Sequence, residues 1–186
     1  MTLPGTVVGD ERIRLFCALR LPDAALEDFV AWQADAFSGV EDVRVVGRTN
    51  LHLTLAFLGQ RPRSEIDDIV GALQAAAAAA QPIQLSLRRY RETRSVGMLT
   101  FDDDAGAAGR LAADLHGRLA RLGVYEPEKR PWLPHLTVLR FRRPPRLRPE
   151  LPELPPFSPS DAALYHSVLR SGGAQYEVVQ SVALGS

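Results

Sequence analysis

Apolar and polar residues form eight short segments in this chain, each the length of a β-strand. The alternation is clearest between residues 83 and 90, where apolar Ile83, Leu85 and Leu87 are separated by polar residues, as on a strand with one buried face. Ser171-Gly172-Gly173 is a suitable hairpin turn before the last strand. The pattern predicts strands at residues 13–19, 43–46, 51–58, 83–90, 96–101, 135–141, 164–169 and 175–183.

Apolar residues three or four positions apart predict three helices between these strands. The first begins at Pro22, the second is capped by the Ser64 side chain and ends in the alanine run 75–80, and the third covers residues 107–122 with Gly123 after its last turn. Their apolar stripes consist of Leu26, Phe29 and Val30; of Ile66, Ile69, Val70 and Leu73; and of Leu111, Leu115, Leu119 and Leu122.

Two of the predicted strands carry the same polar pattern. Leu51-His52-Leu53-Thr54-Leu55 and Pro134-His135-Leu136-Thr137-Val138 both read His, apolar, Thr, apolar. Because side chains alternate along a strand, each motif places its His and Thr on one face and its apolar residues on the other. Two such strands facing each other would bring two imidazoles and two hydroxyls together across a groove.

The order of the elements predicts an α+β fold with mostly antiparallel sheet. The two motif histidines are 83 residues apart, and helices and strands surround both motifs. This arrangement suggests an internal duplication, with two lobes around a central cleft. We expect residues 1–10 to form a flexible tail and residues 11–186 to form a single two-lobed domain with motifs at 52–55 and 135–138. The proline-rich residues 144–159 are expected to be a linker or long loop.

A pair of histidines offers acid–base chemistry at phosphorus. Histidine titrates near neutral pH, so a neutral imidazole can take a proton from the attacking oxygen while a protonated one gives a proton to the leaving oxygen. Thr54 and Thr137 offer hydroxyl donors to phosphate oxygens. We expect no metal and no cofactor, because the chain has no His-Glu-x-x-His, no paired Asp motif and no Walker-type glycine loop. The symmetric motifs do not say which histidine is the acid.

Basic residues cluster beside the second motif, although the formal net charge of the chain is zero. Seven basic residues and no acidic one lie between Lys129 and Arg148, and four more arginines lie between residues 88 and 94. Most of them are interpreted as a solvated face, but a basic rim could also hold an RNA backbone. Arg140 is the favoured phosphate ligand. Strict alternation puts it on the face opposite His135, so only a bulge, a twist or its length would bring it to the phosphate.

The remaining candidates have simpler interpretations. His116 is expected to be exposed on its helix, and His166 to be a structural histidine on a strand. Phe16, Trp32 and Trp132 could stack on a base, but core or rim packing is the preferred interpretation. The single Cys17, the absence of a signal-like N-terminal segment and the absence of a membrane-length apolar run predict a cytoplasmic protein without membrane contact, expected to be a monomer.

The paired motifs and their flanks resemble the two-histidine phosphoesterase superfamily. Within it the chain is similar to the RNA 2′,3′-cyclic phosphodiesterases, also called 2′-5′ RNA ligases. The resemblance extends from an opening strand at residues 14–18, through Asn50–Gly59 and Arg130–Arg140, to a closing hairpin at 164–167 and 173–176. Trp132 stands where the family usually has Phe.

The resemblance implies a bilobal fold with pseudo-twofold symmetry and hydrolysis of 2′,3′-cyclic phosphate RNA ends to 2′-phosphomonoesters. It implies His52 as proton donor and His135 as proton acceptor, and it supports Thr54, Thr137 and Arg140 as phosphate ligands. Some family members also join RNA ends in a reversible, ATP-independent 2′-5′ ligation. The alternative hypothesis is a nucleotide- or RNA-binding module with the same cleft and little turnover; the intact His and Thr residues favour the enzyme.

Overall fold

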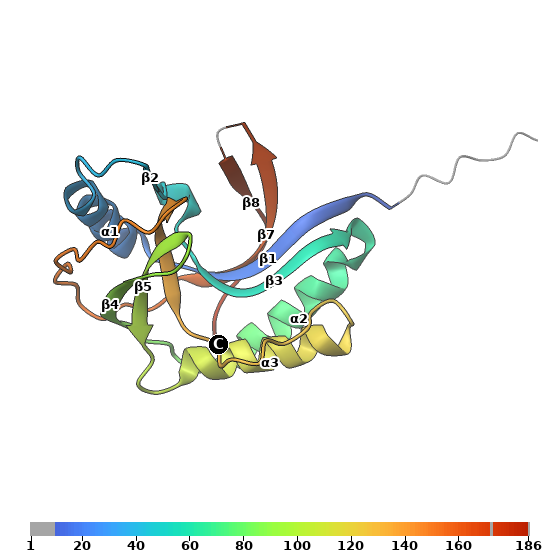
Figure 1. Cartoon of the computed structure of the whole chain (residues 1–186). Helices are drawn as coiled ribbons and strands as arrows, with labels where there is room; N and C mark the ends of the chain where they lie inside the picture. The colour runs from blue at the N-terminus through green and yellow to red at the C-terminus, as the bar shows by residue number, and fades with distance from the viewer. Residues whose placement is uncertain (1–9, 172, 186) are drawn as a thin grey trace, which may run out of the picture.

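The structure, a computed structural model, describes residues 10–171 and 173–185. All eight predicted strands and three predicted helices are present within the described residues (Figure 1). The expected tail, residues 1–10, lies outside the described part of the chain except for Asp10. The elements are β1 Arg12–Arg20, α1 Asp23–Ala36, β2 Val43–Val45, β3 Leu53–Pro62, α2 Ile66–Ala78, β4 Ser86–Glu92, β5 Val96–Asp102, α3 Ala107–Arg121, β6 His135–Phe141, β7 Asp161–Arg170 and β8 Gly173–Val182, with short 3₁₀ turns at Arg48–Asn50 and Arg63–Glu65.

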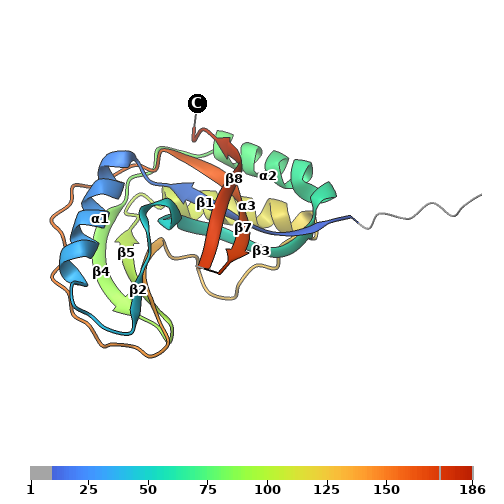
Figure 2. The same ribbon diagram turned by 90° about the horizontal axis from the view of Figure 1, so that it is seen from above.

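The strands form two antiparallel sheets of four strands each. The first sheet has the order β3-β1-β7-β8 and the second the order β2-β6-β5-β4. Helices α2 and α3 lie side by side against the first sheet, and α1 lies against the second (Figures 1 and 2). These two layered units are called the first and second lobe below. The predicted α+β class with antiparallel sheets is confirmed.

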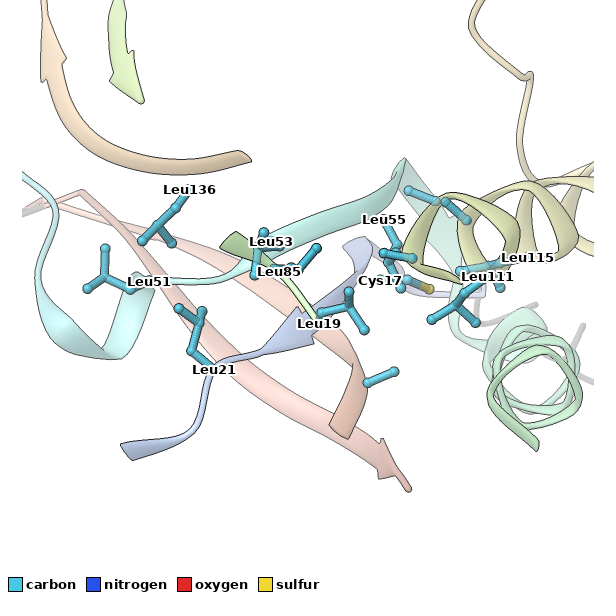
Figure 3. Packing of buried hydrophobic residues seen from close by; sticks show 14 of the residues in the cluster. Cys17, Leu19, Leu21, Leu51, Leu53, Leu55, Leu85, Leu111, Leu115 and Leu136 are labelled. Atoms are coloured by element: carbon cyan, nitrogen blue, oxygen red, sulfur yellow. The ribbon is translucent and has the colours of Figure 1, made fainter. Parts of the chain in front are cut away.

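Apolar side chains from both lobes join in one core. Leu111 and Leu115 of α3 point toward Cys17 and Leu55 of the first sheet (Figure 3), and all four are at most 2% exposed. In the second lobe, Phe29 of α1 makes edge-to-face contact with Phe101 of β5, at 6.0 Å between ring centroids. Edge-to-face rings at such distances add about 0.5–1.5 kcal/mol beyond the area they bury.

In both halves of the chain a strand and a helix precede the motif strand at similar spacing. The first residues of β1, α1 and β3 precede those of β5, α3 and β6 by 84, 84 and 82 residues. The strand after each motif strand is exchanged, because β4 pairs with β5 in the second sheet and β7 pairs with β1 in the first. The spacing of these elements supports the expected duplication, and each half contributes strands to the sheet of the other half.

The predicted cap of the second helix is wrong. Ser64 lies in the 3₁₀ turn before α2, whose N-cap position is Glu65 without a side-chain hydrogen bond. The Ser64 hydroxyl and backbone N–H instead donate to the Asp10 carboxylate. The segment between β6 and β7 is the expected long loop, and Phe157 in it forms an isolated β-bridge with Leu85.

Candidate active site

Both His-Thr motifs line one cavity of about 650 Å³ between the two sheets. His52 directly precedes β3 of the first sheet, and His135 is the first residue of β6 of the second. All five residues that the sequence singled out line this cavity, namely His52, Thr54, His135, Thr137 and Arg140. A cavity of this volume is in the usual range for small-molecule sites.

The two imidazoles are held in the same way. His52 Nδ1 lies 2.8 Å from the Asn50 carbonyl oxygen and His135 Nδ1 lies 2.9 Å from that of Leu133, in each case two residues earlier in the chain. A carbonyl can only accept, so Nδ1 carries the hydrogen in both rings, and Nε2 is left for chemistry. His52 Nε2 is 3.0 Å from Thr54 Oγ1, which ties the first pair of the motif together.

The environment of His52 favours its neutral form. The ring packs against Phe16 at 4.8 Å and against Tyr176 at 5.2 Å between centroids. Desolvation by this burial lowers the pKa of His52 to about 4, while the Asn50 carbonyl acts in the opposite direction and His135 and Arg140 lower it further. A protonated His52 therefore requires a compensating negative charge in the cavity.

A β-bulge brings Arg140 to the face of the histidines. In the pairing of β5 with β6, Gly97 is opposite Leu139 but Met98 is opposite Thr137, so that Val138 is an extra residue. The extra residue shifts the alternation, and Arg140 lines the cavity together with His135. The first motif has the same device, since Leu55 is unpaired in the register between β1 and β3. Phe57 therefore lines the cavity three residues after Thr54, as Arg140 does three residues after Thr137.

Side chains from two helices hold the carbonyl groups of these bulges. His116 of α3 donates from Nε2 to the carbonyl oxygen of Leu55 at 2.7 Å, and Gln33 of α1 donates from Nε2 to that of Val138 at 2.9 Å. His116 and Gln33 are themselves 83 residues apart. The prediction of an exposed His116 is therefore wrong, because it is partly covered and packs on Tyr125 at 4.7 Å between centroids. Neither contact is visible in the local sequence pattern.

The aromatic candidates have structural contacts. Trp32 Nε1 donates to the Glu150 carbonyl at 2.8 Å, and Trp132 Nε1 donates to the Thr54 carbonyl at 2.9 Å. Phe16 lines the cavity but is 3% exposed, so the preferred interpretation as packing residues agrees with these contacts. His166 Nδ1 lies 3.7 Å from a Glu177 carboxylate oxygen, outside the cavity.

Several cavity residues were missed by the sequence reasoning. Arg14 of β1 lies over the ring of Phe57, with 4.8 Å from Cζ to the centroid, and both line the cavity. Arg44 of β2 and Tyr176 of β8 line it as well. Their strands reach the cavity only through pairing with β6 and β7, which a single sequence does not give.

Among the residues that the structure describes, no group of three or more His, Cys, Asp or Glu residues is placed to hold a metal ion. Among the same residues, no helix is both long enough and apolar enough to cross a membrane.

Known proteins of similar sequence belong to one family. A family model described as the 2′-5′ RNA ligase superfamily matches residues 21–168. An Escherichia coli protein named RNA 2′,3′-cyclic phosphodiesterase is 30% identical over 194 residues, covering 92% of this chain and 96% of its own length. A Thermus thermophilus protein of the same name is 31% identical and is covered over 90% of its length.

Solved structures with a similar fold include two bacterial proteins. TT0787 of Thermus thermophilus has a TM-score of 0.80 at 26% identity, covering 92% of this chain and 98% of that one. Escherichia coli LigT complexed with 3′-AMP has a TM-score of 0.77 at 28% identity, covering 94% and 98%.

Proposed function

Since this chain belongs to the 2′-5′ RNA ligase superfamily, we propose that it hydrolyses RNA 2′,3′-cyclic phosphate ends to 2′-phosphomonoesters without a metal ion. The observation that carries the proposal is the presence of two histidines with matched tautomers and two threonines in one cavity. The names of the relatives and the nucleotide in the LigT complex support RNA ends as the substrate class.

In the proposed step, the cyclic phosphate lies between the two motifs. His135 Nε2 takes a proton from water as its oxygen attacks phosphorus, the bond from phosphorus to O3′ breaks, and His52 Nε2 gives its proton to O3′. The product is a 2′-phosphate, and the two histidines exchange protonation states. Hydroxyls of Thr54 and Thr137 donate to the non-bridging oxygens, and Arg140 neutralises the charge that develops on them.

The low pKa of His52 has a direct role in this scheme. Without substrate the ring is neutral at pH 7, because its pKa is about 4. A phosphate anion beside Nε2 favours the imidazolium, so substrate binding would itself prepare the acid. The polarity, with His52 as donor, rests on the resemblance, since the neutral state of the free His52 would equally suit a base.

The proposal includes ATP-independent 2′-5′ ligation. If the 5′-hydroxyl of a second RNA replaces water, its oxygen bonds to phosphorus, the bond from phosphorus to O3′ breaks, and the same proton transfers leave a 2′-5′ phosphodiester beside a 3′-hydroxyl. No activated nucleotide is needed, because the cyclic phosphate is already the reactive group.

The test is turnover of adenosine 2′,3′-cyclic phosphate in excess EDTA, followed by phosphorus NMR of the product. We expect full activity with chelator and a single 2′-phosphate product. Replacement of His52 or His135 by alanine should each lower the rate by about 10²–10⁴-fold, the usual contribution of a general acid or base. His166→Ala is the matched control, because His166 lies outside the cavity.

Several results would count against the proposal. Loss of activity with EDTA that a divalent ion restores would exclude the two-histidine mechanism. A mixture of 2′- and 3′-phosphates would show that the cavity does not orient the ring. Tight binding of adenosine 2′-phosphate without turnover would favour the binding module.

A further inference from the structure

A second cavity adjoins the first at the open edge of the second sheet. Its volume is about 840 Å³, and it is called the arginine groove here. Arg44 and Arg140 line both cavities, so the groove continues directly from the candidate phosphate site. The residues that line it are Asp42, Val43, Arg44, Arg140, Phe141, Arg142 and Arg143.

The charges of the groove are strongly one-sided. Four arginines face one aspartate, which leaves a net charge of +3 along its walls. The side chains of Arg140, Arg142 and Arg143 are exposed. Within residues 10–171 and 173–185, no hydrogen bond or ion pair joins any of these three to a carboxylate.

Two of these arginines lie directly opposite each other. Arg44 of β2 and Arg140 of β6 are register partners in an antiparallel pair, and both side chains line the same cavities. Both arginines therefore lie where the two cavities meet, and phosphate suits the planar guanidinium fork.

We propose that the arginine groove binds the phosphodiester groups of the RNA strand on the 5′ side of the cyclic phosphate. This inference rests on the proposed function, because it takes the cyclic end to lie between His52 and His135. A 2′,3′-cyclic phosphate ends its chain, so the rest of the strand leaves the site from the terminal ribose in the 5′ direction only. The hairpin of β7 and β8 presents uncharged Ser167, Leu169 and Tyr176 to the cavity, whereas the groove presents charge that matches a phosphate backbone.

The groove should distinguish a short RNA with a cyclic end from a cyclic mononucleotide. A mononucleotide cyclic phosphate has no upstream phosphodiester and does not reach Arg142 or Arg143, which line the groove but not the first cavity. A short RNA with the same terminal nucleotide does reach them. The protein should therefore prefer oligonucleotide ends over free cyclic nucleotides, and the preference should weaken with added salt.

The test uses the double variant Arg142→Ala/Arg143→Ala. Its kcat/KM for adenosine 2′,3′-cyclic phosphate should stay within about twofold of the original protein, and its kcat/KM for a tetranucleotide with the same cyclic end should fall at least about tenfold, because two charged contacts to the backbone are lost. Loss of two phosphate contacts should also reduce the slope of log K against log salt by about 1.4. Arg121→Ala is the matched control, as an exposed arginine of α3 outside both cavities.

Binding separates this inference from the proposed function. The dissociation constant of a tetranucleotide that ends in a 2′-phosphate should rise about tenfold in the double variant, whether or not the protein turns over cyclic phosphates. Equal losses of kcat/KM for the mononucleotide and the tetranucleotide, or no loss for the tetranucleotide, would contradict RNA binding in the arginine groove. Failure of the original protein to hydrolyse either substrate, with the binding difference intact, would overturn the proposed function alone.

Discussion

Replacing His52 by alanine should leave a rate that depends on His135 alone and therefore reveals the role of each histidine. If His135 is the base, its neutral form is the active one, and kcat/KM of the His52→Ala variant rises with pH. If His135 is the acid, the same quantity falls with pH. The bell-shaped profile of the original protein cannot make this distinction, because both assignments give the same shape.

The magnitude of the effect follows from the burial of His52. A pKa of about 4 leaves about one molecule in a thousand with protonated His52 at pH 7, which corresponds to about 4 kcal/mol. For His52 to act as the acid, the bound phosphate must compensate most of this cost. We therefore expect the apparent pKa of His52 to be higher in the pH profile of kcat than in that of kcat/KM. The profile of kcat refers to the substrate complex, in which the phosphate is bound.

The assay is hydrolysis of adenosine 2′,3′-cyclic phosphate between about pH 5 and pH 9 by the original protein and by single alanine variants of His52 and His135. The His52→Ala profile should rise with pH and the His135→Ala profile should fall. A falling profile for His52→Ala would reverse the proposed polarity. A flat profile for both variants would refute the assignment of the two histidines as acid and base.

Two further predictions concern stability and positioning. Because the pKa of folded His52 is lowered from 6.5 to about 4, only the unfolded chain gains a proton between these values, so the free energy of unfolding should fall by up to about 3 kcal/mol as pH decreases from 6.5 to 4. Urea unfolding should show this decrease, and a His52→Gln variant should lack it; an equal decrease in both would place its origin elsewhere. His116→Ala removes the donor to the Leu55 carbonyl and should lower kcat about fivefold with little change in KM, as expected for a lost hydrogen bond of about 1 kcal/mol. His116→Gln should restore kcat because Gln33 makes the corresponding contact in the other half, and equal losses in both variants would contradict the positioning role.

The sequence predicted the elements and the motif residues because both depend on local pattern. The position of Arg140 could not be decided in the same way, because strict alternation places it opposite His135. The sequence does contain a signal, since both motifs have two successive apolar residues after Thr, namely Val138-Leu139 and Leu55-Ala56. Both residues of each pair are buried. Two successive buried apolar residues in an otherwise alternating strand indicate a β-bulge.

The sequence pattern does not predict contacts between distant segments. His116 and Gln33 lie in helices whose own periodicity says nothing of the strand carbonyls that they bind. Ser64 contacts Asp10 instead of capping α2, because the start of β1 lies beside the end of β3, where Arg12 pairs with Pro62. The pairing of Arg44 with Arg140 likewise depends on β2 joining the edge of the second sheet. These features arise from tertiary packing, which overrides or adds to local preference.

The exchange of strands between the two halves has a consequence for how the chain folds. Successive strands pass from the first sheet to the second and back, because β1, β3, β7 and β8 belong to one sheet and β2, β4, β5 and β6 to the other. The pairing of Leu15 with His166 closes a loop that contains most of the chain. Such distant pairing makes refolding slow, since the entropy of loop closure is lost before the contacts form. The lobes should accordingly melt together in a single transition. A fragment that ends after β4 should remain unfolded, because it lacks β7, which pairs with β1, and β5, which pairs with β4.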